Sequence, residues 1–314
     1  MQTTRPAAPP LNRRANQPED LFRALRPAQW LKNSIVFAPL LFAEKIHNPQ
    51  LLLMAGLCFL SFCLISSAAY LLNDVMDKNA DQLHPLKRKR PIAQGKVSSK
   101  AALFLALTLA LAGTSVSFAS SAPLAVVVIC YVILTVAYST KLKHLPLIDV
   151  FTIAACFVLR AVAGAVAVKV PVSTWFLLCT SLGALFLALE KRRHEVGVLR
   201  HEAEAHRPAI TIYTPEMVNR LEAIILPGLL TCYVLYSFQS SHGPWMMLTL
   251  PFVLYGVMRY LTLSAQPDSR CGFPEQVILQ DRPLQIALVL WLVCCALVIY
   301  NVLPAALSAS GFAF

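Results

Sequence analysis

The chain has 314 residues and a strongly apolar composition: 57% of the residues are apolar, 14% are charged, and 27 Lys and Arg against 16 Asp and Glu give a formal net charge of +11. Soluble domains contain about 25% charged residues. A soluble globule of this size cannot bury so much apolar surface, and the mean hydropathy is +0.61. The composition excludes a disordered protein, a small disulfide-stapled protein and a soluble nucleic-acid binder, and it indicates an integral membrane protein.

Charge-poor stretches long enough to cross a bilayer follow one another along the chain. About 20 apolar residues cross the hydrocarbon as a helix. Two stretches are long enough for two helices each. The stretch 101–140 is expected to break at Pro123, and the stretch 223–258 is expected to break at 240–244. We therefore expect an all-α, polytopic membrane protein with eight clear spans: 51–72, the two halves of 101–140, 147–168, 172–189, the two halves of 223–258, and 283–314.

A ninth span is predicted at 33–43, although this stretch has only eleven residues and contains Pro39. Lys and Arg gather on the cytoplasmic side of membrane proteins. With nine spans, 24 Lys and Arg lie on one side of the membrane, only Lys45 and Lys169 lie on the other, and Arg160 lies within a span. With eight spans the division is 18 against 8. Nine spans and a cytoplasmic N-terminus are therefore expected.

The sequence predicts one folded domain preceded by a short tail. Residues 1–20 are polar and rich in proline, which indicates a disordered cytoplasmic tail. Residues 21–314 contain all the predicted spans and are expected to form a single transmembrane domain.

An acidic motif, NDVMDKNAD at 73–81, follows the span 51–72 directly. Asn73, Asp74, Asp77 and Asp81 fall within one 100° arc if the helix continues beyond the membrane. Three carboxylates on one face repel one another without a cation, and Mg²⁺ takes one or two carboxylates together with substrate phosphate oxygens. The motif predicts a Mg²⁺–diphosphate site, with a solvated acidic turn as the alternative.

A basic run, KRKRPIAQG at 87–95, follows the acidic motif after His84 and Pro85, where the helix must end. Arginine is suited to bidentate phosphate contacts. The run can therefore hold a second phosphate group beside the Mg²⁺ site. Taken alone, it equally fits the charge asymmetry of the membrane.

These two segments together resemble the UbiA-type prenyltransferase superfamily, through the motif at 73–81 and then His84-Pro85, Lys87, Arg90-Pro91-Ile92 and Gly95. The resemblance implies a bundle of nine transmembrane helices, in agreement with the span count, and an enzyme that uses Mg²⁺ and a diphosphate substrate. Most members attach a prenyl chain to an aromatic acceptor and carry a second Asp-rich motif after span six. This sequence has the mainly basic segment EKRRHE at 190–195 in that place. The departure argues against a second carboxylate cluster and for direct cation contacts to phosphate.

The departure is similar to one branch of the superfamily, the decaprenyl-phosphate phosphoribosyltransferases. Segments along most of the chain resemble this branch: RPAQWLKN at 26–33, YLLND at 70–74, 138–144, 159–164, WFLL at 175–178, and 274–285. The branch transfers phosphoribose from phosphoribosyl pyrophosphate (PRPP) to a long polyprenyl phosphate and releases pyrophosphate. We expect the same reaction here, with Mg²⁺ as cofactor, in the bacterial inner (plasma) membrane and with the active site facing the cytoplasm.

The expected site combines the acidic motif with cations and tyrosines from several spans. Asp74, Asp77 and Asp81 are expected to act in catalysis and, with Asn73, to hold Mg²⁺ and the leaving pyrophosphate. The lipid phosphate is already ionised near neutral pH, so the reaction requires no general base. The residues expected to bind substrate are Lys32, Tyr70, Asn73, Lys87, Arg90, Tyr138, Lys143, Arg160, Lys191 and Arg192.

Arg160 lies deep in a predicted span, where an arginine costs several kcal/mol unless it faces the bundle interior. Asp149 shares its helix face, but the two are about 16.5 Å apart along the axis, too far for an ion pair. Arg160 is expected at the bottom of the phosphate cavity, with a structural arginine bonded to carbonyls as the alternative. Lys143 and Lys32 either hold a phosphate or reflect topology alone.

Two other functions stay open at this point. A prenyltransferase that joins an allylic diphosphate to an aromatic acceptor shares the first motif, but it does not account for the basic segment 190–195. A polyprenyl-phosphate carrier has little use for a Mg²⁺-type carboxylate cluster. The expected partners are PRPP, a polyprenyl phosphate and the membrane, and no nucleic acid; the oligomeric state, including a homo-oligomer, is left open.

Overall fold

The structure is a computed structural model that describes residues 16–199, 212–240, 242–265 and 274–309. Within these ranges the chain is helical and contains no strand. Eight of its helical segments are long and apolar enough to cross a membrane, and they match the eight clear spans. They are α3 (Pro49–Met76), α5 (Ser99–Ser120), α6 (Ala122–Thr140), α7 (Ile148–Ala167), α8 (Thr174–Leu199), α10 (Pro215–Gln239), the pair η5 (Gly243–Thr249) and α11 (Leu250–Ser264), and α13 (Arg282–Ile299).

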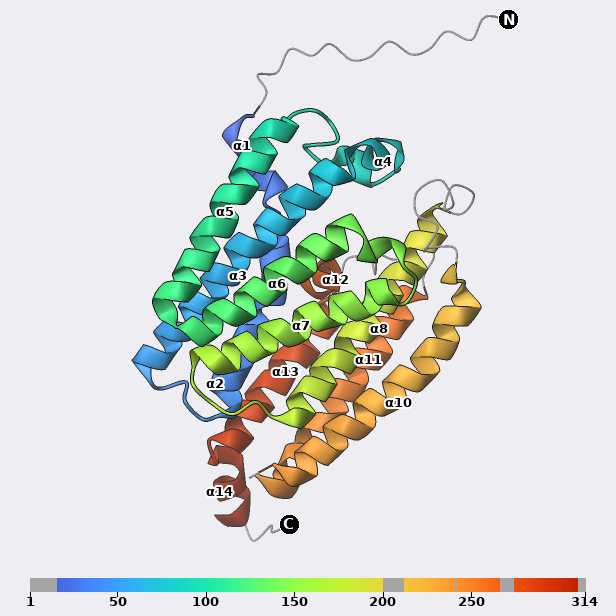
Figure 1. The fold of residues 1–314 in the computed structure, drawn as a ribbon. Coiled ribbons are helices and arrows are strands. Elements are labelled where there is room, and N and C mark those ends of the chain that lie inside the picture. Colours follow the sequence, from blue (N-terminus) through green and yellow to red (C-terminus); the bar gives the residue numbers. More distant parts are fainter. Residues whose placement is uncertain (1–15, 200–211, 241, 266–273, 310–314) are drawn as a thin grey trace, which may run out of the picture.

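A ninth crossing is made by two short helices, η1 (Pro27–Phe37) and α2 (Ala38–Phe42). A 3₁₀-helix rises about 2.0 Å per residue and an α-helix about 1.5 Å, so the two together extend about 30 Å, the thickness of the hydrocarbon core. In Figure 1 this blue segment leads from the end of the bundle that carries α1 (Pro18–Ala24) to the opposite end, where α3 begins. The extended 3₁₀ geometry lets a stretch too short for a regular span cross the bundle.

Small residues let the first crossing lie against α7. A Cβ placed on Gly164 would be 2.3 Å from the backbone oxygen of Val36, so only glycine fits where η1 crosses α7. A similar contact joins α3 to α5, where the Ser61 hydroxyl donates to the backbone oxygen of Gly113 at 2.8 Å. Close backbone approach through small residues is the usual way that membrane helices associate.

Two segment boundaries differ from expectation at the ends of the chain. The predicted span 283–314 is divided, because Asn301 adopts a left-handed conformation (φ 56°) between α13 and α14 (Val302–Ala309). At the other end, the predicted boundary at residue 20 falls inside α1, and Asp20 is buried. The remainder of the predicted tail, 1–15, lies outside the described residues.

The polar elements gather at one end of the bundle. In Figure 1 that end carries α1, α4 (Lys78–Leu83) and the charged extensions of α8 and α10, whereas α14 lies at the other end. α12 (Pro274–Gln280) packs against η1. The first crossing, α3, α6, α7, α8, α12 and α13 together surround one large cavity that extends to this polar end.

Candidate active site

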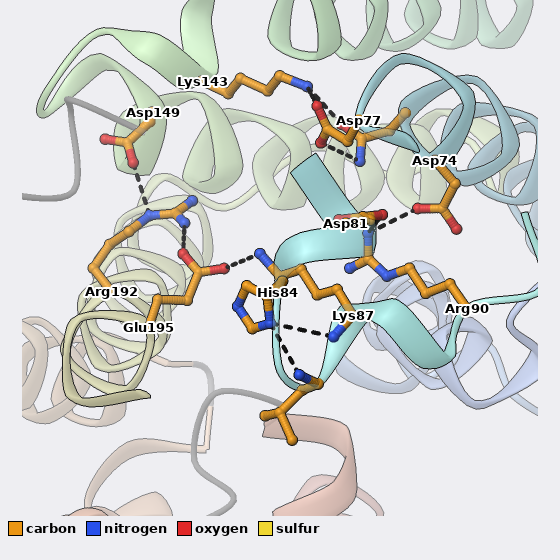
Figure 2. Close-up of polar contacts among 12 residues, drawn as sticks. Asp74, Asp77, Asp81, His84, Lys87, Arg90, Lys143, Asp149, Arg192 and Glu195 are labelled. Atoms are coloured by element: carbon orange, nitrogen blue, oxygen red, sulfur yellow. Dashed lines mark hydrogen bonds and ion pairs between the residues drawn. The ribbon is translucent and has the colours of Figure 1, made fainter. Parts of the chain in front are cut away.

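The acidic motif does not form one continuous helix. α3 ends at Met76, and Asp77 connects it to α4 with backbone angles outside the helical region (φ −89°, ψ 5°). The condition on which the single 100° arc depends, a helix that continues through 73–81, is therefore not met in full. The physical reason is composition, since Asn and Asp side chains compete for backbone hydrogen bonds and are weak helix formers. The motif carboxylates contact separate cations, as Figure 2 shows: Arg90 contacts Asp74 and Asp81, and Lys143 contacts Asp77.

Asp74 and Asp81 form the first group, and both contact Arg90. The Nη1 atom of Arg90 donates to Asp74 Oδ1 at 3.0 Å and to Asp81 Oδ2 at 2.6 Å. Arg26 adds a second cation, with Nη2 at 2.5 Å from Asp74 Oδ1. Both carboxylates are nearly completely buried, so they hold the two arginines in place at the cavity wall.

The charges in this first group depend on one another. Burial raises the pKa of the Asp81 carboxyl because loss of water disfavours its ionised form, while Arg90 acts in the opposite direction. Burial also lowers the pKa of the Arg90 guanidinium, and the positive charge of Arg26 lowers it further. Removal of one of these charged side chains would leave a buried charge without its opposite partner, which is strongly destabilising.

Asn73 and Asp77 form the second group, together with Lys143. The Nζ atom of Lys143 donates to Asp77 Oδ1 at 2.5 Å and to Asn73 Oδ1 at 3.3 Å. The Asn73 amide donates to Asp77 Oδ2 at 3.1 Å. Lys143 lies in η3 (Leu142–His144) and is buried, whereas Asn73 and Asp77 line the cavity.

The second group fits an oxygen-liganded Mg²⁺ better than the whole motif does. Mg²⁺ takes one or two carboxylates and completes its octahedron with water and phosphate oxygens, which a carboxylate and an amide oxygen at a cavity wall allow. Within the described residues, no three His, Cys, Asp or Glu side chains are grouped so that they could hold a metal ion. The geometry favours Asn73 and Asp77 as ligands, and the four-residue ligand set stays a prediction.

The cavity has a volume of about 850 Å³ and a strongly cationic polar end. Two carboxylates from the described residues line it, those of Asp77 and Glu195, along with six basic side chains. These are Arg26, Lys32, Lys87, Arg90, Arg160 and Lys191. A pocket with this excess of cations concentrates anions.

The rest of the cavity is apolar and deep. Leu52 and Asn73 both line it and are 21 positions apart on α3, which corresponds to about 30 Å along the helix axis. Its far end is formed by an aromatic cluster in which Phe42 lies 6.0 Å from Phe176 and 6.5 Å from Trp291 between ring centroids. The cavity therefore extends across most of the hydrocarbon thickness.

Arg160 lies on the cavity wall between these two parts. Its Nε donates to Asn33 Oδ1 at 2.7 Å, and its Nη2 donates to the Tyr131 hydroxyl at 2.6 Å. Its Nη1 donates to the backbone oxygen of Cys156 at 3.0 Å. These three partners are neutral, and the guanidinium of Arg160 also stacks over the rings of Tyr131 and Phe157. Arg160 is thus buried inside the bundle as expected, and its contacts are compatible with both roles predicted for it.

The basic segment 190–195 divides between the cavity and the protein interior. Lys191 and Glu195 line the cavity. Arg192 is buried on the other side, where its Nε lies 2.7 Å from Asp149 Oδ2 and its Nη1 pairs with Glu195. Its Nη2 also donates to the hydroxyl of Tyr138, a cavity-lining residue, at 3.0 Å. The cation that pairs with Asp149 is therefore Arg192 on α8, and not Arg160 on its own helix.

The remaining predicted binding residues lie at the polar end. Lys32 donates to Gln29 Oε1 at 2.6 Å, and the Tyr70 hydroxyl donates to the same atom at 3.4 Å. Lys87 donates to Glu195 Oε1 at 3.0 Å, so it links the loop after α4 to α8. Of the predicted site residues, Asp74, Asp81, Lys143 and Arg192 are the ones that do not line the cavity.

Sequence reasoning did not single out Arg26 and Glu195 as site residues. Arg26 occupies a left-handed backbone position (φ 56°) immediately before Pro27, and its guanidinium lies over the Tyr70 ring at 5.0 Å. Arg26 lies in a segment that resembles the branch and Glu195 lies in the basic segment 190–195, but their contacts depend on partners 48 and 108 positions away. No local pattern signals contacts of that range.

The fold and the cavity define a polytopic membrane protein with an anion-attracting pocket that continues into an apolar channel. The chain belongs to the UbiA prenyltransferase family, whose family model matches residues 34–272. Two solved structures have the same fold. A UbiA homolog from Archaeoglobus fulgidus, described as bound to GPP and Mg²⁺, has a TM-score of 0.71 at 18% identity and covers 90% of this chain and 99% of its own. A digeranylgeranylglyceryl phosphate synthase has a TM-score of 0.63 at 16% identity over 90% and 98%.

Among curated proteins, this chain is similar to decaprenyl-phosphate phosphoribosyltransferases. The enzyme of that name from Corynebacterium glutamicum is 33% identical over 295 residues, which is 91% of this chain and 88% of the relative. The one from Mycobacterium tuberculosis is 32% identical over 286 residues, 88% of this chain and 93% of the relative. The similarity thus spans nearly the whole length of both proteins.

Proposed function

We propose that this protein transfers phosphoribose from PRPP to a long, decaprenyl-type polyprenyl phosphate and releases pyrophosphate. The observation that carries the proposal is the shape of the cavity, which joins six basic side chains at one end to a deep apolar channel. The basic end suits the phosphates of both substrates, and the channel suits a polyprenyl chain. The names of the similar curated proteins support the same reaction.

The donor is proposed to bind with its diphosphate next to Asn73 and Asp77. A Mg²⁺ ion bound there would neutralise the charge that develops on the leaving group. Lys143 holds both side chains in place, and Asp74 and Asp81 position Arg26 and Arg90 at the cavity wall. The motif carboxylates thus act in two ways, through the metal and through the arginines.

The remaining cations are proposed to bind the other phosphate groups. Lys32, Lys87 and Lys191 line the polar end and are available to the 5-phosphate of the donor and the phosphate of the lipid. Tyr70 and Tyr138 would orient these groups from the same wall. Arg160, at the junction with the apolar channel, is proposed to contact the lipid phosphate, while Arg192 acts through Tyr138 and Glu195.

The acceptor is proposed to reach the donor from the membrane through the apolar channel. η1, α2 and α13 all contribute apolar residues to its wall. The C1–O bond to pyrophosphate breaks with its electron pair on the leaving group, and an ionised oxygen of the lipid phosphate forms the new bond to C1. No proton has to be removed from the nucleophile. We further propose that the protein lies in the inner membrane of a bacterium and that its polar end faces the cytoplasm.

The test is a donor comparison with detergent-purified protein, Mg²⁺ and a long polyprenyl phosphate. One sample receives PRPP, and another receives an allylic diphosphate and an aromatic acid, with lipid products identified by mass spectrometry. We expect the lipid in the first sample to gain the mass of phosphoribose. A prenylated aromatic product in the second sample alone would instead identify a prenyltransferase, and binding of the lipid without product in either sample would favour a carrier.

A further inference from the structure

Glu195 is a carboxylate in a cavity that otherwise suits anions. A carboxylate beside phosphate oxygens repels them, so each of the two carboxylates at the wall requires a separate explanation. The proposed function gives Asp77 one, as an oxygen ligand for Mg²⁺. It gives the Glu195 carboxylate no contact with substrate, although this side chain lines the cavity from α8.

Two cation contacts fix the orientation of the Glu195 carboxylate. Lys87 donates to Oε1 at 3.0 Å, and Arg192 pairs with Oε2, as Figure 2 shows. A carboxylate paired with two cations accepts hydrogen bonds without donating any. Neutralising Arg192 does not by itself explain Glu195, because Arg192 also pairs with Asp149 at 2.7 Å.

The chemistry of the two substrates leaves one kind of group that such an acceptor can bind. The phosphates of PRPP and of the lipid are ionised at neutral pH and accept hydrogen bonds. The hydroxyls at C2 and C3 of the ribose ring are the hydrogen-bond donors that remain. The C2 hydroxyl is on the carbon bonded to C1, where the bond to pyrophosphate breaks, and the C3 hydroxyl is on the next carbon of the ring. Dinucleotide-binding sites likewise use an acidic side chain to bind a ribose hydroxyl.

We propose that Glu195 accepts hydrogen bonds from the C2 and C3 hydroxyls of the PRPP ribose. This inference rests on the proposed function and adds the residue that determines donor specificity. An allylic diphosphate has no hydroxyl, so for that donor Glu195 contributes only repulsion. The carboxylate therefore selects a phosphoribosyl donor within a fold whose relatives bind allylic diphosphates, as the GPP in one solved structure illustrates.

The experiment compares PRPP with two analogues that lack the hydroxyl at C2 or at C3. Dissociation constants are measured by displacement of radiolabelled PRPP from the detergent-purified full chain with Mg²⁺. We expect the unmodified protein to bind each analogue about 10- to 100-fold more weakly than PRPP, the range for a hydrogen bond to a charged group. Glu195→Met should bind PRPP more weakly by a similar factor and no longer distinguish it from the analogues. Glu195→Gln, which keeps one acceptor oxygen and the shape of the side chain, should give an intermediate ratio.

The matched control is Asp149→Asn, which alters the other carboxylate on Arg192 from outside the cavity. It should keep the ratio of the unmodified protein even if the overall affinity falls. The inference alone is overturned if Glu195→Met and Glu195→Gln keep that ratio, or if the unmodified protein binds PRPP and its analogues equally well. Failure of the unmodified protein to bind PRPP, together with binding of an allylic diphosphate, would overturn the proposed function and this inference with it.

Discussion

At the scale of single residues, Asp77 gives the most direct test of the site, because of the three motif carboxylates it is the one that lines the cavity. We expect Asp77→Ala to abolish measurable turnover, and Asp77→Asn to lower kcat at least about 100-fold. Loss of one group that stabilises developing charge has an effect of this size. The measurement is initial rate against Mg²⁺ concentration with PRPP and polyprenyl phosphate. Asn79→Ala, an exposed neighbour on α4, should behave as the unmodified protein; near-normal activity of the Asp77 variants would refute the assignment.

Arg160 offers a second test at this scale, because its contacts are compatible with a structural role and a binding role. We expect Arg160→Leu to raise the apparent KM for at least one substrate about 10-fold, which is the effect of losing a charged hydrogen bond. We expect only a small decrease in its melting temperature. Tyr131→Phe removes one acceptor of Arg160 and separates the two roles. A structural arginine predicts that both variants lower the melting temperature while both KM values stay normal.

At the scale of secondary-structure elements, the crossing of η1 over α7 depends on Gly164. An added Cβ would lie 2.3 Å from the backbone oxygen of Val36 and 2.8 Å from its Cα, and neither atom can move without displacing η1. We expect Gly164→Ala to destabilise the protein by about 1–3 kcal/mol, the usual effect of overpacking. Thermal unfolding in detergent is the measurement.

Gly183 on α8 is the matched control for this prediction, because a Cβ there would have no neighbour within 4 Å. Alanine is a better helix former than glycine by about 1 kcal/mol, so Gly183→Ala should leave the stability unchanged or raise it. Equal melting temperatures for the two variants would contradict the close packing of η1 against α7.

The acidic motif illustrates the limit of local pattern at this scale. Its residues are adjacent in sequence, and an ideal helix would direct Asp74, Asp77 and Asp81 to one side. The chain instead turns at Asp77, and the partners come from elsewhere: Arg90 contacts two of the carboxylates, and Lys143 contacts the third. Which carboxylates pair with arginine and which pairs with lysine follows from these distant cations, which helical periodicity does not include.

At the scale of the whole molecule, the charge asymmetry gives a prediction for topology. With nine crossings, 24 of the 27 Lys and Arg lie on one side of the membrane, and this side should be cytoplasmic. Lys45 and Arg88 are exposed and belong to opposite sides. In intact cells, a membrane-impermeant thiol reagent should label Lys45→Cys, and it should label Arg88→Cys only after the membrane is disrupted. Labelling of both positions in intact cells, or of Arg88→Cys alone, would contradict nine crossings with this orientation.

The class of protein, its eight long spans and its family were predictable from the sequence alone, because hydropathy, Lys and Arg placement and short motifs are local properties of the chain. It also indicated the ninth crossing, although the 3₁₀ form that gives a short stretch its reach appears only in the structure. The position of Arg160 inside the bundle was equally predictable, since a lipid-facing arginine is too costly.

The side chains that line the cavity could be distinguished from those that support its wall only in the folded protein. Arg192 was expected among the binding residues, yet it is buried against Asp149, while Glu195, three positions later on the same helix, faces the cavity. Arg26 reaches Asp74 across 48 positions of sequence. Whether a side chain lines the cavity depends on ion pairs between helices that are far apart in the sequence. The energy of each ion pair depends on its burial and on partner residues from other segments of the chain.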